Sequence, residues 1–161
     1  MDYPEIYLRC INVILESEGG YTDDPQDPGG KTNFGLSQRS YPDIDIRELT
    51  KEAAIEIYYK DYWIPMNVQP IPIDELTLHV FDHGINTGQK IAVRLLQRLV
   101  GVSDDGYIGE ITLKGIDDYT GNIVDEYIKR RKLFYVTLVQ NKPELRKFLK
   151  GWLNRIDNTK F

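Results

Sequence analysis

A helical repeat of apolar residues, broken at intervals by glycine and proline, limits the fold of this chain more than any other feature. Near the start, Ile6, Cys10 and Ile14 are four residues apart, which predicts an amphipathic helix from about Pro4 to Glu18. The two glycines that follow are typical of a helix end. Alternating strand patterns are few and short, so the sequence predicts a mainly α fold.

Six further segments carry the same helical period. A Gly-Ile-Asn-Thr-Gly turn is expected between two of them, with Thr87 as the N-cap of the helix that follows. Any β element should be small and lie near residues 21–37. The predicted helices lie at about residues 50–63, 73–83, 88–100, 110–118, 122–140 and 143–157.

Size and composition favour one ordinary globular domain. The chain has 161 residues, enough for a single core, and 41% of them are hydrophobic. A net charge of −5 argues against a general binder of nucleic acid or anionic membranes. The single cysteine excludes an internal disulfide, and the N-terminus lacks the basic start and apolar run of a signal peptide. No apolar run is long enough to span a membrane, and we expect a monomer made in the cytoplasm.

The segment ESEGGYTDDPQDPGGKTNFGLS, residues 16–37, concentrates acids and glycines. Glu18 stands where the first helix ends, Asp27 follows nine residues later, and Thr32 follows five after that. A bend rich in proline and glycine can bring these side chains together. Two carboxyl groups and a hydroxyl suit glycoside hydrolysis, in which one carboxyl donates a proton while the other activates a water. The alternative is a solvated helix end followed by a generic Asp-Pro-Gly-Gly turn.

The same segment resembles the signature of glycoside hydrolase family 108, the phage and bacterial N-acetylmuramidases. The resemblance implies a lysozyme-like helical domain that hydrolyses the β-1,4 bond between N-acetylmuramic acid and N-acetylglucosamine, with Glu18 as the general acid. Thr32 stands one residue closer to Asp27 than its counterpart does in phage-type lysozymes. The matching residues are Glu18-Gly19-Gly20-Tyr21, Asp24-Pro25, Asp27-Pro28-Gly29-Gly30, Thr32 and Asn33-Phe34-Gly35-Leu36.

The resemblance extends over nearly the whole chain. Residues 81–88 look like the middle of the family's domain, and residues 105–113 are similar to the predicted peptidoglycan-binding-like segment that usually follows it. We therefore expect a single domain over residues 1–161. Its catalytic part would cover residues 1–100, with residues 101–161 packed on it as a helical peptidoglycan-binding-like part.

These arguments give a set of candidate site residues. Glu18, Asp27 and Thr32 are the expected catalytic residues, and the presence of a water-holding hydroxyl favours inversion at the anomeric carbon. Aromatic residues at helical spacing are more typical of a core, although one or two can face a groove. The candidates for substrate binding are Tyr21, Asn33, Tyr58, Trp63, Asp82 and Asn86, of which the last two have a satisfied helix pair as the alternative.

No cofactor or metal is expected. His79 and His83 lack further ligands and fit packing or surface positions better, and Asp104 and Asp105 lack the alternating acids of a calcium loop. The expected partner is the glycan strand of peptidoglycan, reached through a holin or a secretion system, with no nucleic acid and no stable membrane insertion. The rival functions are a lytic transglycosylase, which needs one glutamate and no water, and a non-catalytic wall-binding phage structural module.

Overall fold

The computed structural model describes residues 2–23 and 30–161, and these form a mainly helical fold with one small sheet. The expected fold class is therefore confirmed. Within the described residues, no helix is both long enough and apolar enough to cross a bilayer. The elements are α1 (Glu5–Ser17), β1 (Thr32–Asn33), β2 (Leu36–Ser37), the 3₁₀ turn η1 (Ile46–Glu48), α2 (Lys51–Tyr58), the π-helical turn η2 (Tyr59–Trp63), α3 (Ile64–Met66), α4 (Asp74–Thr87), α5 (Gln89–Leu99), α6 (Glu110–Asp117), α7 (Ile123–Asn141), the 3₁₀ turn η3 (Pro143–Leu145) and α8 (Arg146–Asn158).

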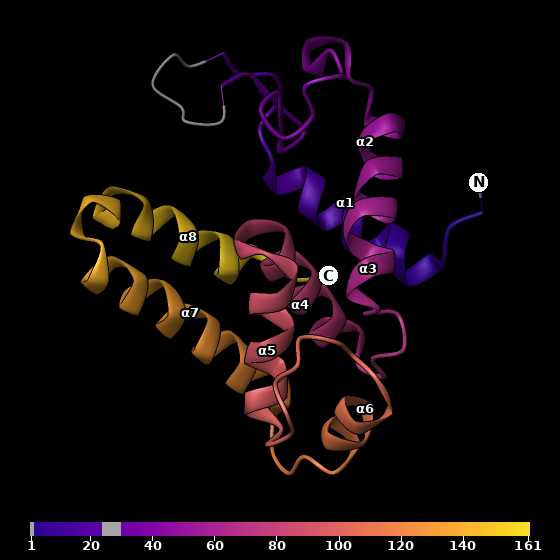
Figure 1. Cartoon of the computed structure of the whole chain (residues 1–161), viewed down its shortest axis with the longest axis vertical. Helices are drawn as coiled ribbons and strands as arrows, with labels where there is room; N and C mark the ends of the chain where they lie inside the picture. The colour runs from indigo at the N-terminus through magenta and orange to yellow at the C-terminus, as the bar shows by residue number, and fades with distance from the viewer. Residues whose placement is uncertain (1, 24–29) are drawn as a thin grey trace.

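Helix α4 lies at the centre of the fold and packs against α1, α5 and α7 (Figure 1). Helices α7 and α8 lie side by side and project from the body of the molecule, on the left of the view. The β-hairpin and its flanking loops lie above α8, beyond the C-terminal end of α1. The end of α1 thus faces the hairpin on one side and α8 on the other.

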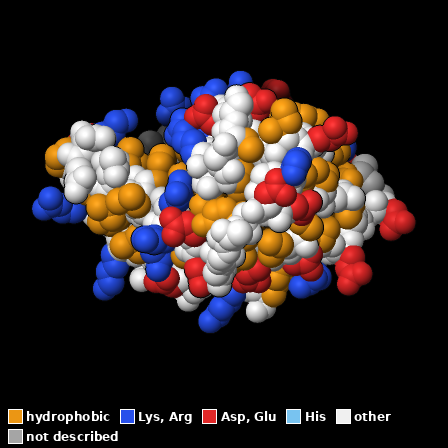
Figure 2. Space-filling model, turned by 90° about the horizontal axis from the view of Figure 1, so that it is seen from below, with side chains coloured by type: hydrophobic (Ala, Val, Ile, Leu, Met, Phe, Trp, Pro, Cys, Tyr) orange, Lys and Arg blue, Asp and Glu red, His pale blue; other side chains and the backbone are white. Residues whose placement is uncertain are grey.

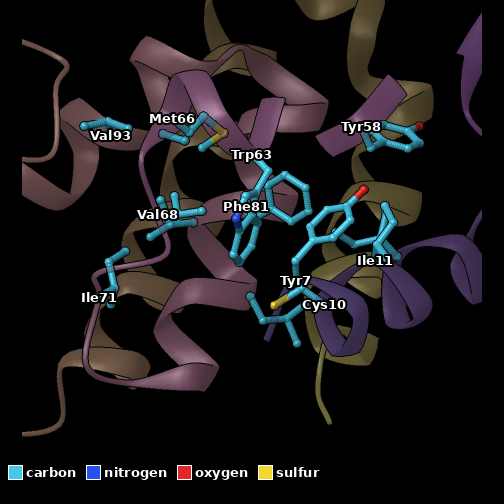
Figure 3. Close-up of a cluster of buried hydrophobic side chains, with 14 of the residues drawn as sticks. Tyr7, Cys10, Ile11, Tyr58, Trp63, Met66, Val68, Ile71, Phe81 and Val93 are labelled. Atoms are coloured by element: carbon cyan, nitrogen blue, oxygen red, sulfur yellow. The ribbon is translucent and has the colours of Figure 1, made fainter. Parts of the chain in front are cut away.

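The hydrophobic core is centred on aromatic rings from three elements that are distant in the sequence. Trp63 packs edge-on against Tyr7 and Phe81, with ring centroids 5.1 and 5.0 Å apart (Figure 3). Such pairs contribute about 0.5–1.5 kcal/mol beyond their buried area. The hydroxyl of Tyr7 donates to the backbone oxygen of Ile55, so this buried phenol is satisfied. Cys10 is buried beside these rings.

The turn predicted within residues 84–88 is wrong, because α4 continues through Gly84 to Thr87. Glycine at 84 serves a close contact instead: a Cβ there would lie 2.4 Å from Cε of Met66. The chain breaks at Gly88, whose φ of +110° suits glycine. Thr87 is not an N-cap, since its hydroxyl donates to the backbone oxygen of His83 within α4. A glycine that permits close packing and one that ends a helix look alike in the sequence.

Candidate active site

Glu18 occupies the C-cap position of α1, where its extended backbone ends the helix and its N–H still bonds to the oxygen of Ile14. The side chain is partly buried, with 18% of its surface exposed. A Cβ added to Gly19 or Gly20 would meet no described atom within 4 Å. The carboxyl group therefore sits on a rigid helix end beside open, side-chain-free backbone.

The β-hairpin brings its turn directly against this carboxyl group. Phe34 and Gly35 form the two-residue turn with φ values of 50° and 77°, the positive pair that a tight hairpin requires. A Cβ on Gly35 would lie 2.8 Å from Cδ of Glu18 and 2.7 Å from the hydroxyl oxygen of Tyr58. Both the backbone conformation and the lack of space therefore require glycine at position 35.

Glu18 and Thr32 line the same hollow, so the structure brings together two of the three predicted catalytic residues. The hydroxyl of Thr32 lies 2.6 Å from that of Thr22, and backbone hydrogen bonds join the same two residues. Asp27 lies outside the described residues. The hollow has a volume of about 280 Å³ and is lined, among described residues, by Glu18, Gly19, Gly20, Thr22, Thr32 and Gly35.

A chain of alternating charges runs from Glu18 into the interior. Arg155 of α8 donates from Nη1 to Oε1 of Glu18 at 2.5 Å and from Nη2 to Oδ1 of Asp82 at 2.7 Å. Arg131 of α7 donates from Nη2 to Oδ2 of Asp82 at 2.5 Å. Neither arginine was among the candidate residues expected from the sequence. Arg155 is 137 residues from Glu18, so no local pattern joins them.

The inner end of this network is almost fully buried. The side chains of Asp82 and Arg131 expose 1% and 0% of their surface. Burial raises the pKa of Asp82, but the guanidinium groups of Arg131 and Arg155 lower it more, so this pKa lies below its usual range. Burial likewise lowers the pKa of Arg155, but Asp82 and Glu18 raise it above its usual range. Asp82 is therefore a carboxylate that holds two arginines in place.

Four of the six candidates for substrate binding are buried, which corrects the expectation that they line a cleft. Asn33 donates its amide to the backbone oxygen of Ile46, and Tyr58 donates its hydroxyl to the oxygen of Phe34. Burial, with the carboxylate of Glu18 nearby, raises the pKa of Tyr58 and keeps it neutral. The four buried candidates are Asn33, Tyr58, Trp63 and Asp82.

Tyr21 and Asn86 are the exposed candidates. Tyr21 exposes 40% of its surface, and its hydroxyl lies 3.4 Å from a carboxylate oxygen of Asp23. The amide of Asn86 lies 3.5 Å from Oδ2 of Asp82, so these two residues form the helix pair that the sequence analysis gave as the alternative. Of these two, neither lines the hollow at Glu18.

The two histidines of α4 are buried against α7. Tyr127 donates its hydroxyl to the oxygen of Ala92, so it accepts from Nδ1 of His83 at 2.9 Å. Burial lowers the pKa of His79 to about 4 and that of His83 to about 3. Within residues 2–23 and 30–161, no three His, Cys, Asp or Glu side chains group so that they could hold a metal ion.

A helical domain with a glutamate at the end of its first helix, facing a short β-hairpin, defines the lysozyme-like class of glycoside hydrolases. The family model of glycosyl hydrolase 108 matches residues 11–88, and that of a predicted peptidoglycan domain matches residues 91–157. The solved structure of SagA from Brucella abortus is similar, with a TM-score of 0.80 and 28% identity over 95% of this chain and 90% of that one. No curated protein matches the sequence.

The chain therefore belongs to glycoside hydrolase family 108, with the predicted peptidoglycan domain following the glycosidase segment. It is a glycoside hydrolase, and its substrate is peptidoglycan. The resemblance found in the sequence is confirmed. The two matched segments meet in the site, because Glu18 comes from the first and Arg155 from the second.

Proposed function

We propose that this protein is an N-acetylmuramidase that cleaves the β-1,4 bond between N-acetylmuramic acid and N-acetylglucosamine, with Glu18 as the general acid. The observation that carries the proposal is the position of the Glu18 carboxyl group, held by Arg155 at the edge of an open hollow that also contains Thr32. Arg155 engages Oε1, which leaves Oε2 to carry the transferred proton. This second oxygen lies on the Gly35 side.

The proposed reaction is a single displacement by water. Glu18 gives its proton to the glycosidic oxygen as the bond from that oxygen to the anomeric carbon breaks. A water attacks the anomeric carbon from the opposite face and passes its proton to the carboxylate of Asp27, which inverts the configuration. The hydroxyl of Thr32 holds this water. The hydroxyl of Thr22, which is hydrogen bonded to that of Thr32, fixes the orientation of the Thr32 hydroxyl.

We also propose that residues 1–161 act as one monomeric domain. The ion pair between Glu18 and Arg155, and those of Asp82 with Arg131 and Arg155, join the glycosidase segment to the following segment at the site itself. Groups this close have to keep their relative positions for acid catalysis. The second segment thus completes the catalytic part in addition to contacting the wall.

Digestion of purified peptidoglycan, with mass analysis of the products, tests this function. We expect wild type to release reducing muropeptides and Glu18→Gln to lose about 10²–10⁴-fold in rate, because an amide cannot donate the proton. Glu52→Gln, an exposed acid on α2, is the matched control and should retain full activity. Products with a 1,6-anhydro ring would instead identify a lytic transglycosylase. Activity retained by Glu18→Gln would exclude this residue as the acid.

A further inference from the structure

A second hollow lies between α1 and α8 and adjoins the candidate acid. We call it the α1–α8 groove; it has a volume of about 600 Å³, within the range of about 300–1,000 Å³ that is usual for ligand sites. Ser17 of α1 and Gly151, Trp152, Arg155 and Asn158 of α8 are among its lining residues.

Two residues connect the groove to the candidate active site. Arg155 lines the groove and donates to the carboxylate of Glu18, while Ser17 is the neighbour of Glu18 in the chain. The hollow at Glu18, at about 280 Å³, lies just below the usual size for a ligand site. A polymer cut at Glu18 must extend on both sides of the bond, so it needs space beyond this hollow. The groove lies next to the acid and provides that space.

The groove offers the contacts that a sugar ring uses. Trp152 is partly exposed and is held by stacking on Tyr135, with ring centroids 5.0 Å apart at 29°. A fixed aromatic ring suits the apolar face of a pyranose. The hydroxyl of Ser17 donates to the backbone oxygen of Ile14, so its oxygen can still accept a hydrogen bond from a ligand. The side-chain amide of Asn158 forms no hydrogen bond with any described residue. These groups match the hydroxyl and acetamido substituents of an amino sugar.

The charges of the groove favour a neutral ligand. Arg155 is already neutralised by Glu18 and Asp82, with Nη1 at 2.5 Å and Nη2 at 2.7 Å from their carboxylate oxygens. The other charged residues of the lining, Glu16 and Lys160, have opposite signs. A peptide stem of peptidoglycan carries carboxylates and would find no net positive charge here, whereas an N-acetylated sugar is uncharged.

We propose that the α1–α8 groove is a sugar subsite, which binds an N-acetylated pyranose of the glycan strand next to the bond that Glu18 cleaves. This assignment rests on the proposed function for the identity of the strand. The face of α8 that carries Gly151, Arg155 and Asn158 forms one wall of the subsite, and Trp152 supports the ring. The predicted peptidoglycan domain thereby contacts substrate inside the catalytic cleft.

Gly151 allows the groove to be filled without touching the catalytic residues. A Cβ at this position would meet no described atom within 4 Å, and leucine is a good helix former, so Gly151→Leu should fold. The matched control is Asn154→Leu, an exposed position of α8 that does not line the groove. Thermal unfolding followed by circular dichroism checks that both variants keep the fold.

The test measures binding and cleavage separately. Binding is measured by calorimetry in a Glu18→Gln background, with peptide-free glycan strands as the probe, so it does not depend on activity. We expect Gly151→Leu to weaken this binding at least about tenfold, because the leucine side chain would displace the sugar from its contacts in the groove. Asn154→Leu should leave the binding unchanged. In the active enzyme, Gly151→Leu should raise KM to a similar extent on peptide-free and on stem-bearing strands.

Each other outcome has a definite meaning. Equal affinity in Gly151→Leu and in the Glu18→Gln parent would overturn the subsite. A loss confined to stem-bearing strands would overturn the sugar assignment in favour of the peptide stem. Lack of glycan cleavage by wild type would reject the proposed function, while the binding comparison would still decide whether the groove holds a sugar.

Discussion

The hairpin of α7 and α8 differs in charge from the rest of the molecule, and the difference bears directly on the site. Residues 1–122 carry 21 Asp and Glu against 10 Lys and Arg, whereas residues 123–161 carry 10 Lys and Arg against 4 Asp and Glu. Figure 2 shows Lys and Arg side chains around the projecting end formed by α7 and α8. The net charge of −5 is therefore the sum of a negative charge on the body and a positive charge on the helical hairpin.

The two regions meet in a network to which each contributes one sign of charge. Glu18 and Asp82 come from the glycosidase segment, and Arg131 and Arg155 come from the hairpin. The hairpin thus supplies the cations that hold the buried carboxylate and the candidate acid. The segment matched by the predicted peptidoglycan domain thus contributes two arginines to the candidate active site.

The largest expected effect comes from Asp82→Asn. The change leaves Arg131, which is 0% exposed, as an uncompensated buried charge, and such losses cost about 3–5 kcal/mol. Urea denaturation measures the free energy of unfolding. Asp74→Asn is the control: its partner Arg9 is exposed, so the loss should stay below about 1 kcal/mol. Equal losses in the two variants would show that the buried network does not stabilise the junction of the two regions.

Arg155→Lys tests whether the hairpin positions the acid. Lysine keeps the charge but cannot donate to Glu18 and Asp82 through separate guanidinium nitrogens. We expect kcat to fall about 100-fold because a small displacement of a catalytic group has this scale of effect, with a smaller change in KM. Steady-state kinetics at a temperature where the variant is fully folded measure both constants. A lower melting temperature with unchanged kcat would reduce Arg155 to a structural role.

Local sequence patterns predicted the helices and placed Glu18 at the end of the first one, because both features depend on neighbouring residues. The first helix, predicted from about Pro4 to Glu18, is observed at Glu5–Ser17, and the small β element lies where it was expected. The network could not be predicted in this way because its partners are far apart in the chain. Arg131 did leave a signal: it occupies a stripe of otherwise apolar or aromatic buried positions on α7, formed by Ile123, Tyr127, Arg131, Tyr135 and Val139.

Aromatic residues show the opposite problem, since the sequence placed most of them in a core and left open which one or two face a groove. Trp63 is 2% exposed and belongs to the core, whereas Trp152, which the sequence analysis did not select, lines the α1–α8 groove. Helical spacing is the same for a core face and for a groove face. Trp63 is buried because Tyr7 and Phe81 pack on it, whereas Trp152 lines the groove, and the spacing of residues does not reveal this difference.

The contact between α4 and α7 should also make the fold sensitive to acid. Burial lowers the pKa of His79 and His83 to about 4 and 3, below the value of about 6.5 in an unfolded chain. The unfolded state therefore takes up protons first as pH falls. Their contribution to stability is complete above about pH 6.5. It is lost progressively as the pH falls to about 4 for His79 and about 3 for His83, by about 2 kcal/mol per histidine between pH 7 and 5.

His83→Asn separates this effect from other titrations. The asparagine amide can still donate to Tyr127, but it does not titrate. Urea denaturation at pH 7 and pH 5 should show that the variant loses about 2 kcal/mol less than wild type over this interval. The groups that act on the ring, Tyr127, Arg131, Asp82 and His79, are present in both proteins. Identical losses in both proteins would exclude His83 as a source of the acid sensitivity.

The smallest effect compares one substitution in the two regions, glycine to alanine within a helix. In α4, a Cβ at Gly84 would lie 2.4 Å from the flexible end of the buried Met66, so we expect Gly84→Ala to destabilise the protein by about 1 kcal/mol or more. In α8, a Cβ at Gly151 would meet no described atom within 4 Å, so Gly151→Ala should stabilise it by about 0.5–1 kcal/mol through helix propensity. Urea denaturation at pH 7 gives both values. Opposite signs would establish that α4 is closely packed while this face of α8 is open, and a destabilising Gly151→Ala would mean that the groove is filled in the free protein.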